Sequence, residues 1–413
     1  MSTVKPLKTK NTDYINILVL CLCVTAVFFV AWTFTGQWPW KSQAYNSYIL
    51  QAQSWLEGRL DLGRDYPYLE LAIFNNKYYV SFPPFPSYVM LPFVLIGWNS
   101  CDSMIAFAVS LLGAVYAFKI LKHFDIESKT AIFFTLLLTV GSNWLMTAQN
   151  AWVWFIAQNM AFTLSLMAIY YALKNKIGLS LAFWACAVGC RPFQILYLPA
   201  LLYLIYNAHK AVNPEDKIID IIKKRYLALI PMAVIALSYM ILNFARFGNI
   251  TEFGHNYLPE FVRAENGQFS LTYLVPNLLQ LLRPVTLDAQ GQLHFEIYNG
   301  FLFFAANPLF LLAMVRGLLL RLPGHQAEVQ VSVPLPSAGW FVAAMCLLMT
   351  CLTCMHHTLG GWQFGARYMV DLFPWLFVWF LGRPKWRPDS SAWALCGAAM
   401  LFNLYGALYM LNT

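Results

Sequence analysis

Long apolar windows recur along this chain, and they constrain its fold more than any other feature of the sequence. A helix needs roughly 20 mostly apolar residues to cross the hydrocarbon core of a bilayer. Of the 413 residues, 59% are hydrophobic and only 11% are charged, whereas a soluble domain carries about 25% charged residues. These proportions exclude a soluble enzyme. The windows predict about 11 transmembrane helices, at residues 14–34, 103–118, 130–148, 153–173, 177–190, 193–207, 226–245, 297–315, 338–355, 368–382 and 391–411.

Basic residues are concentrated in every second connection between these windows. The positive-inside rule associates such residues with the cytoplasmic face of a membrane, so the pattern predicts a cytoplasmic N-terminus. The formal charge of +8 is explained in this way, and the sequence has no basic cluster interleaved with aromatic residues that would indicate nucleic-acid binding. The residues that define the pattern are Lys5, Lys8, Lys10, Lys119, Lys122, Lys129, Lys174, Lys176, Lys210, Lys217, Lys223, Lys224, Arg225, Arg316, Arg321, Arg383, Lys385 and Arg387.

The other connections are predicted to face the extracytoplasmic side. They are the long loops at about 35–102 and 246–296 and a shorter loop at 356–367. The apolar segment 84–97 is short and interrupted by proline, and counting it as a span would invert the basic connection that follows it. We therefore expect it to be interfacial or re-entrant. Residues 1–413 are predicted to form a single polytopic membrane domain without a separate soluble domain, and its function is expected in the outer loops.

The first outer loop contains two predicted elements. Apolar residues recur at helical spacing from Tyr45 to Leu56, with polar residues on the opposite face, which predicts an amphipathic helix lying on the membrane. Gly58 is expected to end this helix. Further along, LAIF and KYYV are predicted to pair across Asn75 and Asn76 as a short hairpin. The predicted fold class is therefore an all-α integral membrane protein with amphipathic juxtamembrane helices in its first outer loop.

Five stretches of the chain, taken together and in order, resemble a known family of membrane proteins. They read GRLDL, then ELAIFNNKYYVSFPPFPSYVMLPF, CRPFQILYLPALL, NFARFGNITEFGHNY and GGWQFGARYMVDLFP. Together they resemble the polytopic glycosyltransferases of the C superfamily (GT-C), in particular bacterial relatives of the dolichyl-phosphate-mannose protein mannosyltransferases and of the lipid A aminoarabinose transferases. The resemblance covers about the whole chain. It implies a transferase of the bacterial cytoplasmic (inner) membrane that uses a polyprenyl-phosphate sugar donor.

The sequence departs from this family at two acidic positions. Members generally place an acidic residue just after the first helix, but here the stretch reads QWPWKSQAYNSY, without Asp or Glu. A second acidic residue, often found before the fourth span, is replaced by AQNAWVWFIAQNMAF. An active enzyme of this kind must therefore use another carboxylate.

Transfer of a sugar requires a base that deprotonates the acceptor hydroxyl. Glu70 is the first candidate, because it lies in the outer loop beside the predicted hairpin, where partial burial would raise its pKa. Asp65 and Asp61 in the same segment are alternatives, and Asp61 also fits a turn that caps local backbone. The alternative interpretation of Glu70 is a solvated loop glutamate.

Transfer also requires a cation that stabilises the departing phosphate. Arg367 is a donor-binding candidate, because a guanidinium can hold two phosphate oxygens at once. On a helix it would also share a face with Asp371, so a structural ion pair between them is the alternative. Arg191, between two apolar segments, is assigned to the same role, with snorkelling towards lipid headgroups as its alternative. Lys77 is a further cation assigned to this group.

Aromatic and histidine side chains are candidates for contact with sugar or acceptor. Tyr78, Tyr79 and Trp362 could stack on sugar rings, although aromatic residues at this depth also form the interfacial belt of membrane proteins. His255 is assigned to the same group. His255, with the nearby Glu252, and the pair His356-His357 could also supply metal ligands or general acids. The cofactor is unknown; a divalent metal remains possible and no metal ligand is assigned.

The expected function is transfer of a sugar from a polyprenyl-phosphate donor to an extracytoplasmic glycan, glycolipid or protein acceptor, with the lipid bilayer as the surrounding partner. Two alternatives remain open. A transporter or flippase of a lipid-linked sugar would place polar residues near the membrane midplane and contain inverted repeats. A catalytically inactive relative would retain the family's sequence pattern without its acidic residues.

Overall fold

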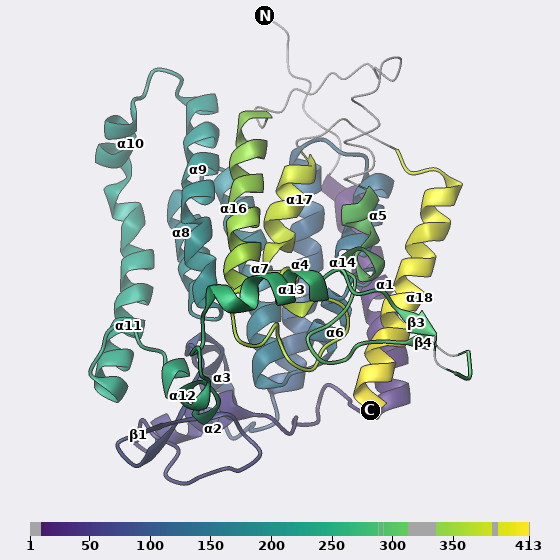
Figure 1. Cartoon of the computed structure of the whole chain (residues 1–413). Coiled ribbons are helices and arrows are strands. Elements are labelled where there is room, and N and C mark those ends of the chain that lie inside the picture. Colours follow the sequence, from purple (N-terminus) through teal and green to yellow (C-terminus); the bar gives the residue numbers. More distant parts are fainter. Residues whose placement is uncertain (1–9, 288, 292, 313–335, 382–386, 413) are drawn as a thin grey trace, which may run out of the picture.

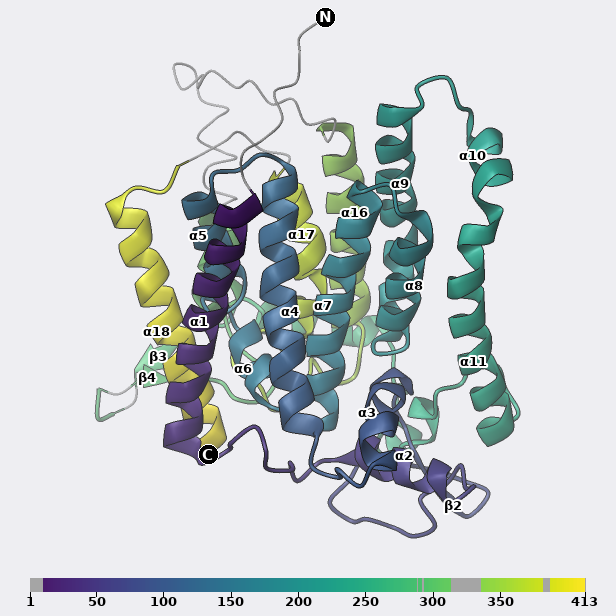
Figure 2. The ribbon, with the colours of Figure 1, turned by 180° about the vertical axis from the view of Figure 1, so that it is seen from behind.

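The computed structural model describes residues 10–287, 289–291, 293–312, 336–381 and 387–412. The described chain is mostly helical, and its long helices run side by side as a bundle (Figure 1). Seen from behind, α4 (Asp102–His123) lies between α1 (Lys10–Thr35) and α7 (Val153–Leu173) and packs against both (Figure 2). The described residues contain two β-sheets, and each of them is a short two-stranded hairpin.

Five helical runs among the described residues are long and apolar enough to cross a membrane. This bears out the prediction of an all-α membrane protein, whose apolar helices indicate a lipid bilayer as their surroundings. The 30-residue run combines α10 (Ile218–Arg225), η2 (Tyr226–Leu229) and α11 (Ile230–Phe247), so it begins earlier than the predicted window and includes basic residues expected in a loop. The five runs are Asp13–Thr35, Asp102–His123, Val153–Leu173, Ile218–Phe247 and Ser390–Leu411, the last of them within α18 (Ser390–Asn412).

The window at 130–148 is not one helix, which corrects the prediction. It is divided into α5 (Ser128–Leu138) and α6 (Trp144–Gln149). The intervening residues include Ser142, whose hydroxyl accepts a hydrogen bond from the backbone N–H of Trp144 at 3.3 Å. Serine and asparagine side chains compete for backbone groups in this way and favour helix starts over helix interiors.

The window at 297–315 is also not a continuous helix over its described part. Residues 297–302 are not helical, α14 spans only Phe303–Ala306, and residues 308–312 are helical again. Gly300 has φ +80°, and a Cβ atom there would meet the carbonyl oxygen of Gly365 at 1.9 Å. This segment is therefore held against the loop at 356–367 instead of entering a helix. Residues 313–315 lie outside the described residues.

The remaining helical segments are short. The helix α8 (Ile177–Val188) ends shortly before Pro192, because proline disfavours the helical conformation of the residue before it. The chain then continues as η1 (Pro192–Tyr197) and α9 (Leu198–Val212). That residue, Arg191, is extended. Further on, α16 (Pro336–Cys354) is followed by η5 (Arg367–Leu372) and α17 (Phe373–Leu381).

The predicted hairpin is confirmed as β1 (Leu71–Phe74) paired antiparallel with β2 (Lys77–Val80). Asn75 and Asn76 both have positive φ, 50° and 59°, as the tight turn of a two-residue hairpin requires. A second hairpin joins β3 (Thr286–Leu287) to β4 (Leu293–His294).

The amphipathic helix forms as α2 (Ser47–Leu56), followed by α3 (Phe85–Leu95), which is too short to cross a bilayer. Part of the polar face of α2 packs against α3. Gln51 is buried, and its side-chain oxygen accepts a hydrogen bond from the hydroxyl of Ser87 at 2.8 Å.

The first predicted outer loop and the start of the second lie at one end of the bundle (Figure 1). That end holds α2, α3, the first hairpin and α12 (Pro259–Arg263), while the connection between α9 and α10 lies at the other end. Near α12 the chain forms η3 (His255–Tyr257) and η4 (Leu271–Tyr273), and α13 (Leu274–Gln280) then runs across the bundle. The loops with candidate site residues are thus close in space.

Candidate functional site

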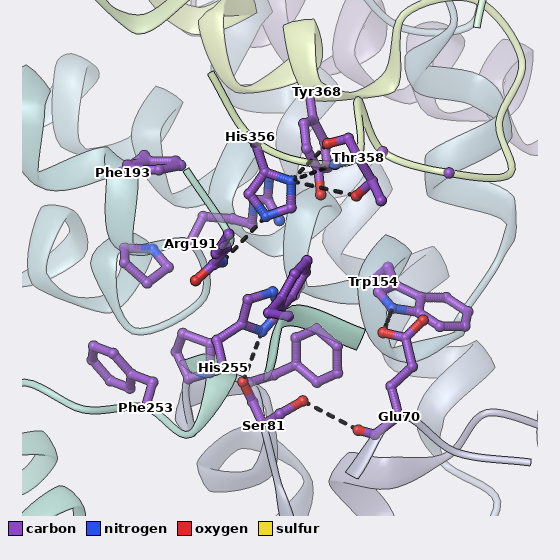
Figure 3. A pocket seen from close by; sticks show the side chains of 18 of the residues that line it. Glu70, Ser81, Trp154, Arg191, Phe193, Phe253, His255, His356, Thr358 and Tyr368 are labelled. Carbon is purple, nitrogen blue, oxygen red and sulfur yellow. Dashed lines mark hydrogen bonds between the residues drawn. The ribbon is translucent and has the colours of Figure 1, made fainter. Parts of the chain in front are cut away.

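A cavity of about 650 Å³ opens at this loop end of the bundle. Its walls come from the first outer loop, the start of α7, the connection between α8 and η1, residues 251–269 and the stretch 356–368. The cavity therefore joins all three predicted outer loops. Figure 3 shows Arg191 and His356 on one side of it and Glu70 with Trp154 on another.

Arg367 is the most unusual residue of the cavity wall. Its side chain is only 4% exposed, and one terminal nitrogen donates a hydrogen bond to the carbonyl oxygen of Gly360. Its Nε and its other terminal nitrogen have no hydrogen-bond partner among the described residues. The guanidinium lies 5.0 Å from the ring centroids of both Phe155 and Tyr368. Burial lowers the pKa of Arg367 to about 10, so it stays charged at neutral pH.

Leaving donors of a buried charged group without partners is costly, because the group has lost its hydration without compensation. The two free nitrogens of Arg367 therefore mark a place where an anionic ligand would be stabilised. A phosphate or carboxylate would accept both hydrogen bonds at once.

Asp371 pairs with Arg191 instead of Arg367. Nε and one terminal nitrogen of Arg191 lie 3.0 Å from the same carboxylate oxygen of Asp371. The expected pair between positions 367 and 371 does not form, because these residues lie on the 3₁₀ helix η5, which has three residues per turn and places the two side chains on different faces. Arg191 still lines the cavity, 5.0 Å from the ring of Tyr368, but its charge is already compensated.

Two histidines face the cavity in their neutral form. Nδ1 of His255 donates to the carbonyl oxygen of Ser81 at 3.2 Å, which leaves Nε2 as the unprotonated nitrogen. His356 lies 2.6 Å from the carbonyl oxygen of Thr358 through Nδ1 and 3.1 Å from the side-chain nitrogen of Gln268 through Nε2. Burial lowers the pKa of His255 to about 4 and that of His356 to about 3. The adjacent His357 does not line the cavity, but its Nδ1 lies 3.7 Å from a carboxylate oxygen of Glu260, which does.

Glu70 lies at the rim of the cavity, beside the start of the first hairpin. Its carboxylate accepts a hydrogen bond from the indole N–H of Trp154 at 2.8 Å. The residue as a whole is exposed, yet the protein around its carboxylate raises its pKa above the ordinary value, and the bond from Trp154 opposes this rise. A carboxylate with a raised pKa is a better proton acceptor at neutral pH than an ordinary glutamate.

Four of the candidate residues lie away from the cavity lining. Asp65 is exposed, and Lys77 is paired with Asp61 at 3.4 Å on the outside of the hairpin. Tyr78 is half-buried, and Tyr79 is buried against the ring of Phe247 at 5.2 Å. Burial raises the pKa of Tyr79. The cavity thus brings together Glu70, Arg191, His255, Trp362 and Arg367 of the predicted site, the other four lie outside it, and the functional roles of all nine stay predictions.

Some residues of the cavity wall were not anticipated. Trp152 and Trp154 at the start of α7, Tyr45 before α2, and Gln268 line the cavity together with the expected Trp362. The stretch AQNAWVWF contained the two tryptophans, but its composition is also that of an interfacial belt, so the sequence alone did not distinguish the two roles.

No group of three or more His, Cys, Asp or Glu side chains suited to a metal ion occurs among the described residues. His255 and His356 approach each other with ring centroids 6.3 Å apart, and Glu252 uses its carboxylate within its own loop, on Gly254 and Asn256. The groups in the cavity wall can bind an anion through Arg367, accept a proton at Glu70 or Glu260, and contact a ligand through aromatic rings.

No model of a known protein family matches this chain, and no curated protein is significantly similar to it.

Proposed function

We propose that this chain is an integral-membrane glycosyltransferase that moves a sugar from a polyprenyl-phosphate donor to an extracytoplasmic acceptor. The proposal is carried by Arg367, a buried guanidinium with two unpartnered nitrogens on the wall of a cavity large enough for a sugar phosphate. The family resemblance described above supplies the class of donor.

In the proposed reaction, the side chains of the cavity have separate roles. The acceptor oxygen attacks the anomeric carbon, and the bond from this carbon to the phosphate oxygen breaks. The leaving phosphate keeps the bonding electrons, and Arg367 stabilises its negative charge through two hydrogen bonds. Arg191, whose charge is compensated by Asp371, lines the same cavity and also contacts the ring of Tyr368. The products are a new glycoside and a polyprenyl phosphate.

Glu70 is the proposed base, which takes the proton of the acceptor hydroxyl. Its raised pKa suits this role, and it and Arg367 influence each other's pKa across the cavity. The carboxylate expected just after the first helix is missing from this sequence, and Glu70 reaches the cavity from later in the same loop.

The proposed topology has about 11 spans, a cytoplasmic N-terminus and the cavity on the outer face of a bacterial cytoplasmic membrane. The alternate distribution of basic residues supports this orientation. The lining of the cavity also favours an enzyme over a transporter, because transporters bind substrate between spanning helices near the midplane and this cavity is lined largely by residues of the predicted outer loops.

Sugar transfer by the full-length protein in nanodiscs tests the proposal. Radiolabelled polyprenyl-phosphate sugars would be supplied with a total extract of envelope lipids and glycans, and label in a new product is expected. Donor binding without any product would identify an inactive relative. Movement of labelled donor across a sealed vesicle membrane, again without product, would favour the flippase alternative.

Two variants with matched controls assign the roles. Glu70→Gln should reduce turnover by about 10²- to 10⁴-fold, the usual contribution of a general base, whereas Glu265→Gln, exposed in another loop outside the cavity, should not.

Arg367→Ala should weaken donor binding by roughly 10- to 100-fold, and Arg263→Ala should leave it intact. Full turnover in Glu70→Gln removes Glu70 as the base, and unchanged donor affinity in Arg367→Ala removes the phosphate site.

A further inference from the structure

The cavity has an aromatic wall, formed by Tyr45, Trp152, Trp154 and Trp362, that the reaction proposed above does not use. Trp152 and Trp362 are stacked, with ring centroids 5.0 Å apart and planes at 25°. Tyr45 lies 4.7 Å from the ring of Trp152 and 5.1 Å from that of Trp154. All four side chains are only half-buried, so each keeps surface towards the cavity.

The aromatic wall is separated from Arg367 by a single ring. Phe155 lies 5.0 Å from the guanidinium of Arg367 and 5.9 Å from the ring of Trp152. Glu70, through its bond to Trp154, is attached to the aromatic wall itself. A ligand on the aromatic wall is therefore next to the base, with the anion site beyond it.

The chemistry of the aromatic wall selects its occupant. Ring faces carry negative partial charge and attract the weakly positive C–H groups on the face of a sugar ring. An isoprenoid chain could also cover the rings, but it would strip water from the Glu70 carboxylate without replacing its hydrogen bonds, which is costly. Sugar hydroxyls would replace them. A peptide serine or threonine would leave most of the four rings uncovered.

We infer that the aromatic wall is an acceptor subsite for a carbohydrate ring, so that the acceptor is a glycan or the glycan part of a glycolipid and not a protein side chain. This inference rests on the proposed function for the meaning of acceptor. The binding of a sugar ring to the aromatic wall is independent of it and can be measured without a donor.

The experiment uses full-length protein in nanodiscs and three neutral probes, maltotriose, chitotriose and α-linked mannotriose, with binding followed by saturation-transfer NMR. At least one probe should bind the wild-type protein. Trp362→Ala and Trp152→Ala should each weaken that binding by about tenfold, the loss of one stacking contact. Trp362→Phe, which keeps a ring face, should restore part of it.

Trp40→Ala is the matched control, because Trp40 is stacked on Trp38 at 5.1 Å in the same loop as Tyr45 but outside the cavity lining. It should bind the probe as the wild type does. Polyprenyl phosphate should bind all four variants equally, which shows that the anion site and the fold are intact.

The outcomes separate the two proposals. Failure of all three probes to bind, or equal binding by Trp362→Ala and Trp40→Ala, overturns the carbohydrate subsite. Transfer of label to a serine- and threonine-rich peptide that the probes do not inhibit also overturns it, while the transferase stands. Trp362-dependent probe binding without transfer from any donor upholds the subsite and overturns the transferase.

Discussion

The Glu70 carboxylate is subject to two opposed influences. The protein around the carboxylate raises its pKa by displacing water from it, and the hydrogen bond from Trp154 lowers the pKa by stabilising the charged form. A general base works only when deprotonated, so the turnover should fall as the pH drops through the pKa of Glu70. Because that pKa lies above the ordinary glutamate value, the acidic limb of the pH profile should lie at a higher pH than an ordinary glutamate base would give.

Replacing Trp154 by phenylalanine tests this balance. The ring is kept, but the N–H donor is lost, so the pKa of Glu70 should rise further and the acidic limb of kcat/KM should move to higher pH. At high pH, where Glu70 is deprotonated in both proteins, the rates should converge. The control is Trp98→Phe, whose indole lies outside the cavity lining. An unshifted limb in Trp154→Phe would mean that another group titrates.

At the scale of single residues, the sequence predicted the location of several side chains better than it predicted their partners. Glu70, Arg191 and Arg367 all reach the cavity as expected from their places in the outer loops. The partner of Asp371 was missed because it depends on a 3₁₀ helix and on a residue 180 positions away. Long-range pairs of this kind have no signal in a single sequence.

Among the elements, α18 packs against the loop that contains Arg367 and fixes its position. Gly406 on α18 is so close to the buried ring of Phe364 that a Cβ atom there would lie 2.1 Å from it. Phe364 is enclosed by Phe295, Phe301 and Phe402, with centroids 4.9–5.5 Å away, so its ring has little room to move. The position of the loop therefore depends on a glycine in a distant helix.

Gly406→Ala is expected to destabilise the protein by about 1–3 kcal/mol, the usual cost of overpacking a core, and to reduce donor binding because the loop of Arg367 shifts. Gly397→Ala on the same helix is the matched control, since a Cβ atom there meets nothing within 4 Å. It should be neutral or slightly stabilising. Melting temperature in detergent and donor affinity measure both effects, and equal behaviour of the two variants would contradict the packing argument.

Helix existence was easier to predict than helix continuity. The windows at 153–173 and 391–411 agree closely with α7 and α18, because a long uninterrupted apolar run has few alternatives in a membrane. The break between α5 and α6 depends on serine and asparagine side chains that bind local backbone. The irregular part of 297–312 depends on its contact with Gly365. Neither break changes the hydropathy enough to be recognised.

For the whole molecule, the remaining question is which end of the bundle faces outwards. The cavity lies towards the end of the bundle that holds the first predicted outer loop, and the described basic connections lie at the other end, so a single orientation satisfies both the proposed chemistry and the positive-inside rule. A donor carried on the outer leaflet can reach the cavity only in that orientation.

Single cysteines at the two ends decide the orientation. Asn266→Cys lies in an outer loop and Glu215→Cys in a basic connection, and both positions are exposed. In intact cells a membrane-impermeant thiol reagent should label Asn266→Cys and leave Glu215→Cys unlabelled until the membrane is opened. The nine native cysteines are buried or half-buried, which keeps the background low. The opposite labelling pattern would place the cavity in the cytoplasm, where a sugar carried on the outer leaflet cannot reach Arg367, and the proposed reaction would have to be abandoned.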